Sequence, residues 1–203
     1  MADALGDLLK AEHFEPELIV GHSAGAAIAL QMTFTGGLTP GLLVGLNAAL
    51  FPYGGWLAPL AQPLARAFTA LAPVPRILAA RARQPGTVER LIAKTGSRLD
   101  PAGIETYRNI LERENHVAAT LSMMANWDLN PLLKLLPELA TPLCLVVGEG
   151  DRTVPPGQAA KVLERVPAGR IIRLGGLGHL AHEEKPRLIE DAIEQAQAWR
   201  HGL

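Results

Sequence analysis

An uncharged stretch, residues 18–65, limits most strongly how this chain can fold, because it contains no Asp, Glu, Lys or Arg. A run of about 20 apolar residues can cross a bilayer as a helix. Turn-forming residues interrupt this stretch, and the interruptions are Gly21-His22-Ser23, Gly36-Gly37, Pro40-Gly41 and Pro52-Tyr53-Gly54-Gly55. Because such residues mark turns and loops, the stretch predicts buried strands and a buried helix rather than a membrane span.

Composition narrows the class of protein further. The chain has 203 residues, 48% of them hydrophobic, which suggests one domain with room for an inserted subdomain. Lys and Arg (19) nearly balance Asp and Glu (20), so we expect no nucleic-acid partner. A single cysteine excludes an intrachain disulfide, and no cluster has metal-ligand spacing, so we expect no metal and no cofactor. The first ten residues lack the pattern of a signal peptide, which favours a cytoplasmic location.

Apolar runs and helical periodicity alternate along both ends of the chain. Continuous apolar runs predict strands at residues 17–20, 42–46, 141–147 and 170–174. Helices are predicted at residues 2–13, 24–35 and 186–200. This alternation predicts an α/β fold with a parallel sheet, built from residues 1–47 and 138–203. Residues 48–137 read as short helices separated by prolines, which predicts a helical cap inserted into the core.

The motif Gly21-His22-Ser23-Ala24-Gly25 carries the strongest chemical signal. It follows a predicted strand and precedes a predicted helix, which is the context of a nucleophile elbow. Such a turn holds its serine in a strained backbone conformation, and small residues two positions before and after it avoid clashes. We therefore predict Ser23 as the nucleophile and the Ala24 N–H, at the helix N-terminus, as an oxyanion donor.

A serine nucleophile needs a base and an acid that orients the base, in the chain order Ser, acid, His. Asp151 follows the third predicted strand and His179 follows the fourth, so both lie where ligands meet an open α/β sheet. We predict Asp151 as the acid and His179 as the base. Asp128 and Glu149 remain alternatives for the acid, and His182 remains one for the base.

Three further residues are predicted to contact substrate. His22 lies inside the elbow, Asn47 follows the second predicted strand, and Trp127 lies near the exit of the cap. The apolar residues 56–71 also leave open a weak association with a membrane surface.

The elbow, Asp151, His179 and the cap together resemble the α/β-hydrolase fold. More narrowly, the chain resembles the magnesium-chelatase accessory proteins of bacteriochlorophyll biosynthesis. The strings that carry this resemblance are Gly21-His-Ser-Ala-Gly-Ala-Ala27, Gly45-Leu-Asn-Ala-Ala-Leu50, Thr95-Gly-Ser-Arg-Leu-Asp100, Met123-Met-Ala-Asn-Trp-Asp-Leu129 and Gly176-Leu-Gly-His-Leu-Ala-His-Glu183. The resemblance implies a role in photosynthesis, near magnesium insertion into a tetrapyrrole, with magnesium-chelatase subunits as partners.

The chain departs from this family before the elbow. The fold usually places about four strands and a second oxyanion donor ahead of the serine, whereas one strand is predicted here. We therefore expect an N-terminally truncated α/β-hydrolase fold, with activity impaired by the missing oxyanion loop. The first strand would then be an exposed sheet edge that could pair with a second copy of the chain.

Two classes of function follow from these expectations. The first is a serine hydrolase that cleaves an ester or acyl bond, as an accessory factor for magnesium chelatase or as a general carboxylesterase. The second is a non-catalytic protein that binds a tetrapyrrole or the chelatase. A serine at the nucleophile position argues against epoxide hydrolases and haloalkane dehalogenases, which use a carboxylate there.

Overall fold

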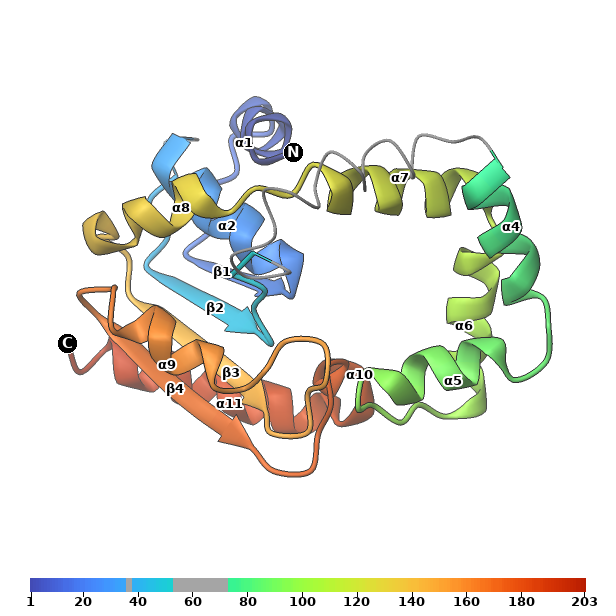
Figure 1. The fold of residues 1–203 in the computed structure, drawn as a ribbon. Helices are drawn as coiled ribbons and strands as arrows, with labels where there is room; N and C mark the ends of the chain where they lie inside the picture. The colour runs from blue at the N-terminus through green and yellow to red at the C-terminus, as the bar shows by residue number, and fades with distance from the viewer. Residues whose placement is uncertain (36–37, 53–72) are drawn as a thin grey trace. The chain divides into compact units, whose positions relative to one another are not determined.

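The computed structural model describes residues 1–35, 38–52 and 73–203 (Figure 1). The chain divides into two compact units. The first comprises Met1–Phe51, Thr95–Ser97 and Leu129–Leu203, and the second comprises Pro52–Lys94 and Arg98–Asp128. The first unit therefore includes residues 48–51, 95–97 and 129–137, which lie inside the predicted cap. Residues 56–71, where a membrane contact is predicted, lie outside the described residues.

A four-stranded parallel sheet forms the centre of the first unit. Its strands are β1 (Leu18–His22), β2 (Leu42–Leu46), β3 (Leu143–Gly148) and β4 (Gly169–Leu174), and their spatial order equals their chain order. Every residue of β2 and β3 is buried, as their continuous apolar sequences predict for central parallel strands. β1 lies at one edge of this sheet, and its Val20 is 41% exposed.

Helices cover both faces of the sheet. Leu42, Val44 and Leu46 of β2 point to the face covered by α11 (Pro186–Arg200), where they pack with Ala192 and Ala196. Gly45 points to the opposite face, where a Cβ would lie 3.5 Å from the Cβ of Ala26 in α2 (Ala24–Thr35). The tighter contacts of such a Cβ would be with Leu145 Cδ2 at 2.9 Å and the Ala48 Cβ at 3.0 Å, so the missing side chain at Gly45 makes room for these two side chains.

The remaining helices of the first unit are short or peripheral. They are α1 (Ala2–Ala11), α8 (Asn130–Leu135), α9 (Gln158–Leu163), α10 (Ala181–Glu184) and the 3₁₀ turn Leu136–Glu138. α1 contacts α2, and α9 contacts β4. α1 ends two residues before its predicted end, because the chain turns at His13, whose φ is +51°.

The helices described in the second unit are joined by short turns and irregular segments. The unit contains α4 (Pro73–Ala82), α5 (Thr87–Lys94), α6 (Pro101–Leu111) and α7 (Glu114–Ala125). Asp100 caps α6 by accepting a hydrogen bond from the Gly103 N–H at 2.7 Å, and Pro101 occupies the first turn, where its missing N–H costs nothing. Across the described residues, no helix combines the length and the apolar character needed to cross a membrane.

Candidate functional site

The elbow places Ser23 on the turn between β1 and α2. Its φ is +51°, a left-handed conformation that costs a non-glycine residue energy and often marks functional sites. Gly21 is sterically required, because a Cβ there would lie 2.6 Å from the Ala26 backbone. At Gly25 a Cβ would meet no described atom within 4 Å, so the predicted steric reason applies to Gly21 and not to Gly25.

Backbone hydrogen bonds hold this strained turn in place. The Ser23 N–H donates to the Leu46 carbonyl at 2.9 Å. The Ser23 carbonyl accepts from the Ala26 N–H at 3.2 Å and from the Ala49 N–H at 3.1 Å. The serine is thereby tied to its own helix and to the end of β2, which limits the movement of its backbone.

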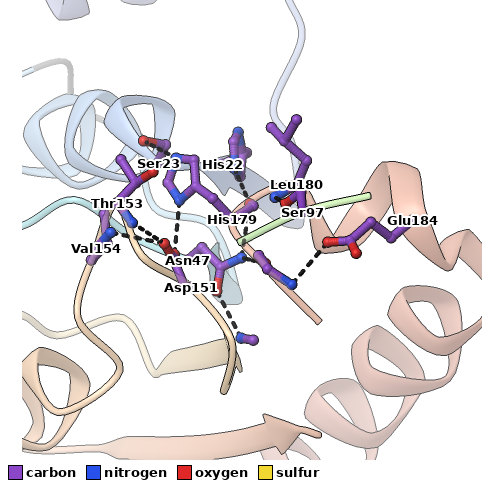
Figure 2. A network of polar contacts seen from close by, with 12 residues as sticks. His22, Ser23, Asn47, Ser97, Asp151, Thr153, Val154, His179, Leu180 and Glu184 are labelled. Carbon is purple, nitrogen blue, oxygen red and sulfur yellow. Dashed lines mark hydrogen bonds and ion pairs between the residues drawn. The ribbon is translucent and has the colours of Figure 1, made fainter. Parts of the chain in front are cut away.

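Ser23, His179 and Asp151 form one line of hydrogen bonds (Figure 2). The His179 Nδ1–H donates to Asp151 Oδ2 at 2.8 Å, which leaves Nε2 to accept from the Ser23 hydroxyl at 3.1 Å. The second carboxylate oxygen of Asp151 accepts from the Thr153 and Val154 N–H groups at 2.7 and 2.9 Å. His179 and Asp151 are only 6% and 5% exposed, so water competes little for these bonds. The arrangement can remove a proton from a serine hydroxyl.

The alternative acid and base residues are not part of the line of hydrogen bonds described for Ser23, His179 and Asp151. The side chain of Glu149 is exposed, and Asp128 belongs to the second unit. His182 lies in α10, where its Nε2 is 3.5 Å from Glu183 Oε1 and its ring centroid is 4.3 Å from that of His22. Burial lowers the pKa of His182, and the charge of Glu183 opposes this effect.

His22 supports the backbone of the base. Its Nε2–H donates to the His179 carbonyl at 2.9 Å, and the two ring centroids are 4.8 Å apart. Burial disfavours the charged ring and lowers the pKa of His22 to about 4, although the hydrogen bond to the carbonyl opposes this shift. His22 is therefore neutral at pH 7, and it adds no positive charge next to an imidazole that must accept a proton.

Asn47 links three loop ends. Its φ is +44°, and only 3% of the residue is exposed. Its amide nitrogen donates to the carbonyls of Gly178 and His179 at 2.9 and 2.8 Å, while its oxygen accepts from the Gly148 N–H at 2.7 Å. Both amide hydrogens are thus used within the protein, so Asn47 could donate to a substrate only by breaking these bonds.

The remaining predicted site residues are Ala24, as an oxyanion donor, and Trp127, as a substrate contact. Ala24 is the first residue of α2, so its N–H has no acceptor within the helix and lies at the positive end of the helix dipole. Trp127 lies in the second unit two residues after the end of α7, is half-buried, and donates its backbone N–H to the Met124 carbonyl at 3.3 Å. The contact of Trp127 with substrate stays a prediction.

Cys144 belongs to the core. It lies in the middle of β3, is fully buried, and its pKa is raised to about 11 because burial disfavours the thiolate. Among the described residues, no group of three or more His, Cys, Asp or Glu could hold a metal ion.

Sequence reasoning missed two side chains that bind the loop of His179. Glu184 Oε1 accepts from the Gly178 N–H, and Ser97 Oγ accepts from the Leu180 N–H, both at 2.8 Å. A glycine-rich loop that becomes buried must find such partners. Nothing in the sequence indicates which side chains provide them, since Ser97 lies 83 residues from Leu180.

Comparison with known proteins gives similarities along almost the whole chain. A sequence profile described as the alpha/beta hydrolase family matches residues 1–192. The chain is 39% identical over 188 residues to the magnesium-chelatase 30 kDa subunit of Rhodobacter capsulatus, covering 90% of this chain and 63% of that protein. It is 29% identical over 203 residues to an epoxide hydrolase of Mycobacterium tuberculosis, covering 95% of this chain and 91% of that protein.

Solved structures share the same architecture. An alpha/beta hydrolase fold protein from Burkholderia ambifaria superposes with a TM-score of 0.72 at 22% identity, covering 95% of this chain and 70% of that chain. At this identity the likeness concerns the fold alone. The chain thus spans 63% of the length of the magnesium-chelatase relative and 70% of the length of this structural neighbour.

Proposed function

The chain belongs to the alpha/beta hydrolase family, and on this premise we propose that it is a serine hydrolase that cleaves an ester or related acyl bond, as an accessory factor for magnesium chelatase. The observation that carries this proposal is the unbroken line of hydrogen bonds from Ser23 through His179 to Asp151. A serine at the elbow favours acyl transfer over epoxide opening, which uses a carboxylate in that place.

The mechanism assigns one role to each of these residues. Ser23 Oγ attacks the carbonyl carbon while His179 Nε2 takes its proton, and Asp151 stabilises the resulting imidazolium. The Ala24 N–H donates to the developing oxyanion. His179 then gives its proton to the leaving group, and the acyl-enzyme forms. Water, deprotonated by the same imidazole, hydrolyses that intermediate and restores the serine.

The link to magnesium chelatase rests on the 39% identity to the 30 kDa subunit. A tetrapyrrole carries carboxylates, so an ester of one of them belongs to the class of bond that an acyl-transfer site cleaves. Magnesium-chelatase subunits are the partners this proposal implies. The main alternative within this proposal is a general carboxylesterase that has no role alongside magnesium chelatase.

A fluorophosphonate probe tests the nucleophile, because it forms a covalent bond only with an activated serine. We expect the wild-type protein to be labelled and Ser23→Ala to remain unlabelled. His179→Ala should be labelled at least 100-fold more slowly, because the serine then lacks its base. Ser122→Ala is a matched control, since Ser122 is exposed on α7. An unlabelled wild-type protein, or equal labelling of wild type and Ser23→Ala, would contradict the proposal.

A second candidate function is non-catalytic binding of a tetrapyrrole or of the chelatase. It is favoured by the similarity to the magnesium-chelatase 30 kDa subunit, whose name describes a subunit and not a hydrolytic activity.

Genetic complementation distinguishes the hydrolase function from non-catalytic binding. Wild type and Ser23→Ala are expressed in a bacteriochlorophyll-producing strain that lacks the corresponding relative. Hydrolysis predicts that wild type restores pigment and that a stably folded Ser23→Ala does not. Restoration by both proteins would favour the binding function. Failure of both, together with fluorophosphonate labelling of wild type, would favour a general carboxylesterase.

A further inference from the structure

Three residues of the inserted chain belong to the catalytic unit. Thr95–Ser97 groups with the first unit, whereas the chain on either side, Lys94 and Arg98, belongs to the second. The sequence around these residues has no role in the proposed mechanism. We call these three residues the 95–97 segment.

The 95–97 segment binds the loops of both Asp151 and His179. The Thr95 carbonyl accepts from the Arg152 N–H at 3.1 Å and from the His179 N–H at 3.3 Å. One carbonyl therefore joins the residue that follows the acid to the backbone of the base. Ser97, which is only 2% exposed, extends the contact by accepting from the Leu180 N–H at 2.8 Å.

Glycines allow the three backbones to approach closely. Gly96 has a φ of +86°, and a Cβ there would collide with the Gly150 carbonyl oxygen. A Cβ on Gly178 would collide with the Gly96 backbone and with the Ser97 nitrogen. Side chains larger than hydrogen at these positions would push the 95–97 segment away from both loops.

The backbone around His179 is extensively hydrogen-bonded. From the Gly178 N–H to the Leu180 N–H, each polar backbone group has a partner. Figure 2 shows the side chains that contribute: Glu184, Asn47 and His22 bind on one part of the loop, and Ser97 binds at Leu180. Among the contributors that the described residues provide, the 95–97 segment comes from within the insertion.

We propose that the 95–97 segment is a positioning element, which holds the acid and base loops in register so that His179 stays aligned between Asp151 and Ser23. The catalytic consequence rests on the proposed serine-hydrolase function. Small displacements of reacting groups are costly, since about 1 Å can reduce a rate by about 100-fold. A segment of the insertion would thereby fix the position of the His179 side chain.

The test removes the Ser97 hydroxyl and follows His179 in two independent ways. Ser97→Ala leaves the Leu180 N–H without this acceptor, Ser97→Thr keeps a hydroxyl, and Ser122→Ala is the matched control on α7. The first readout is fluorophosphonate labelling, separated into the probe's affinity and its maximal rate. The second is the proton NMR signal of the His179 Nδ1–H, which the hydrogen bond to Asp151 protects from exchange with water.

We expect Ser97→Ala to lower the maximal labelling rate by about 10-fold, the effect of losing one hydrogen bond, with the probe's affinity unchanged. Its Nδ1–H signal should broaden. Ser97→Thr should recover most of both, and Ser122→Ala should match wild type. A Ser97→Ala protein that folds and keeps the wild-type rate and a sharp signal would overturn the proposal.

The two proposals can fail separately. If the wild-type protein is not labelled, the hydrolase function fails, but the NMR signal still reports on His179. A signal that broadens in Ser97→Ala and recovers in Ser97→Thr then supports positioning by the 95–97 segment. A signal that is equally sharp in all three proteins contradicts positioning whatever the labelling shows.

Discussion

Replacement of Asn47 should destabilise the protein more than any exposed substitution, because one side chain satisfies three buried backbone groups. In Asn47→Gly the Gly148 N–H and the Gly178 carbonyl both lose that partner, while the His179 carbonyl keeps the hydrogen bond from His22. Glycine also accepts the φ of +44° without strain, so this variant removes the side chain without straining the folded backbone, while it adds conformational freedom to the unfolded chain.

The magnitude follows from these bonds. A buried backbone group left without a partner costs about 1–3 kcal/mol, so two such groups should lower the free energy of unfolding by about 3 kcal/mol. Asn47→Ala loses the same hydrogen bonds and in addition places an alanine in the left-handed region, which costs about 1 kcal/mol more. The expected order of stability is wild type, then Asn47→Gly, then Asn47→Ala.

Urea unfolding followed by far-UV circular dichroism measures these differences, and hydrogen exchange of the Gly148 amide reports directly on the lost bond. Asn109→Ala is the matched control, since Asn109 is exposed on α6 and its replacement should change stability by less than about 0.5 kcal/mol. If Asn47→Gly were as stable as this control, and if the Gly148 amide exchanged as slowly as in wild type, Asn47 would not hold the loop ends together.

Two further predictions concern pH and the sheet edge. Between pH 6.5 and about 4 the unfolded chain binds a proton at His22 that the folded protein does not bind. The free energy of unfolding should therefore fall as the pH falls, by about 2 kcal/mol after allowance for the partial exposure of the ring. His22→Gln should reduce the difference between urea unfolding at pH 7 and at pH 5, whereas replacement of the exposed His201 by Gln should not; an unchanged difference in both would refute the assignment. At the edge of the described sheet, Val20→Lys should shift a self-associated form toward monomer in sedimentation experiments, and Leu91→Lys, an exposed apolar control on α5, should not. A wild-type protein that sediments as a monomer at all concentrations would remove this idea.

The sheet and the elbow could be predicted because local physical rules govern them. A strand that is apolar on both faces must be buried on both, which indicates a parallel sheet before any partner is known. Gly21 allows the backbone of Ala26 to pass 2.6 Å from where a Cβ would be, so its place two residues before Ser23 is a steric requirement of the turn. The family and the fold class that follow from these residues are confirmed.

Which carboxylate contacts His179, and which groups bind the His179 loop, depend on residues that are close in space but distant in the chain. Glu149 and Asp151 follow the same strand and Asp128 lies near the exit of the predicted cap, so the sequence left all three open, whereas the structure places Asp151 Oδ2 2.8 Å from His179 Nδ1. Asn47 illustrates the same limit, because its amide group binds backbone groups more than 100 residues away, which its position after β2 does not indicate. Its contact with substrate stays a prediction.

The elements and the nucleophile turn follow from neighbouring residues, because hydrophobic periodicity and steric clashes act over a few positions. Apart from Glu184, which lies six residues from Gly178, the hydrogen-bond partners described for the His179 loop come from residues 83 to 157 positions away, as Ser97 and His22 show. No local pattern encodes these pairs, since a buried carbonyl or N–H accepts any partner of suitable geometry that the packed chain brings to it.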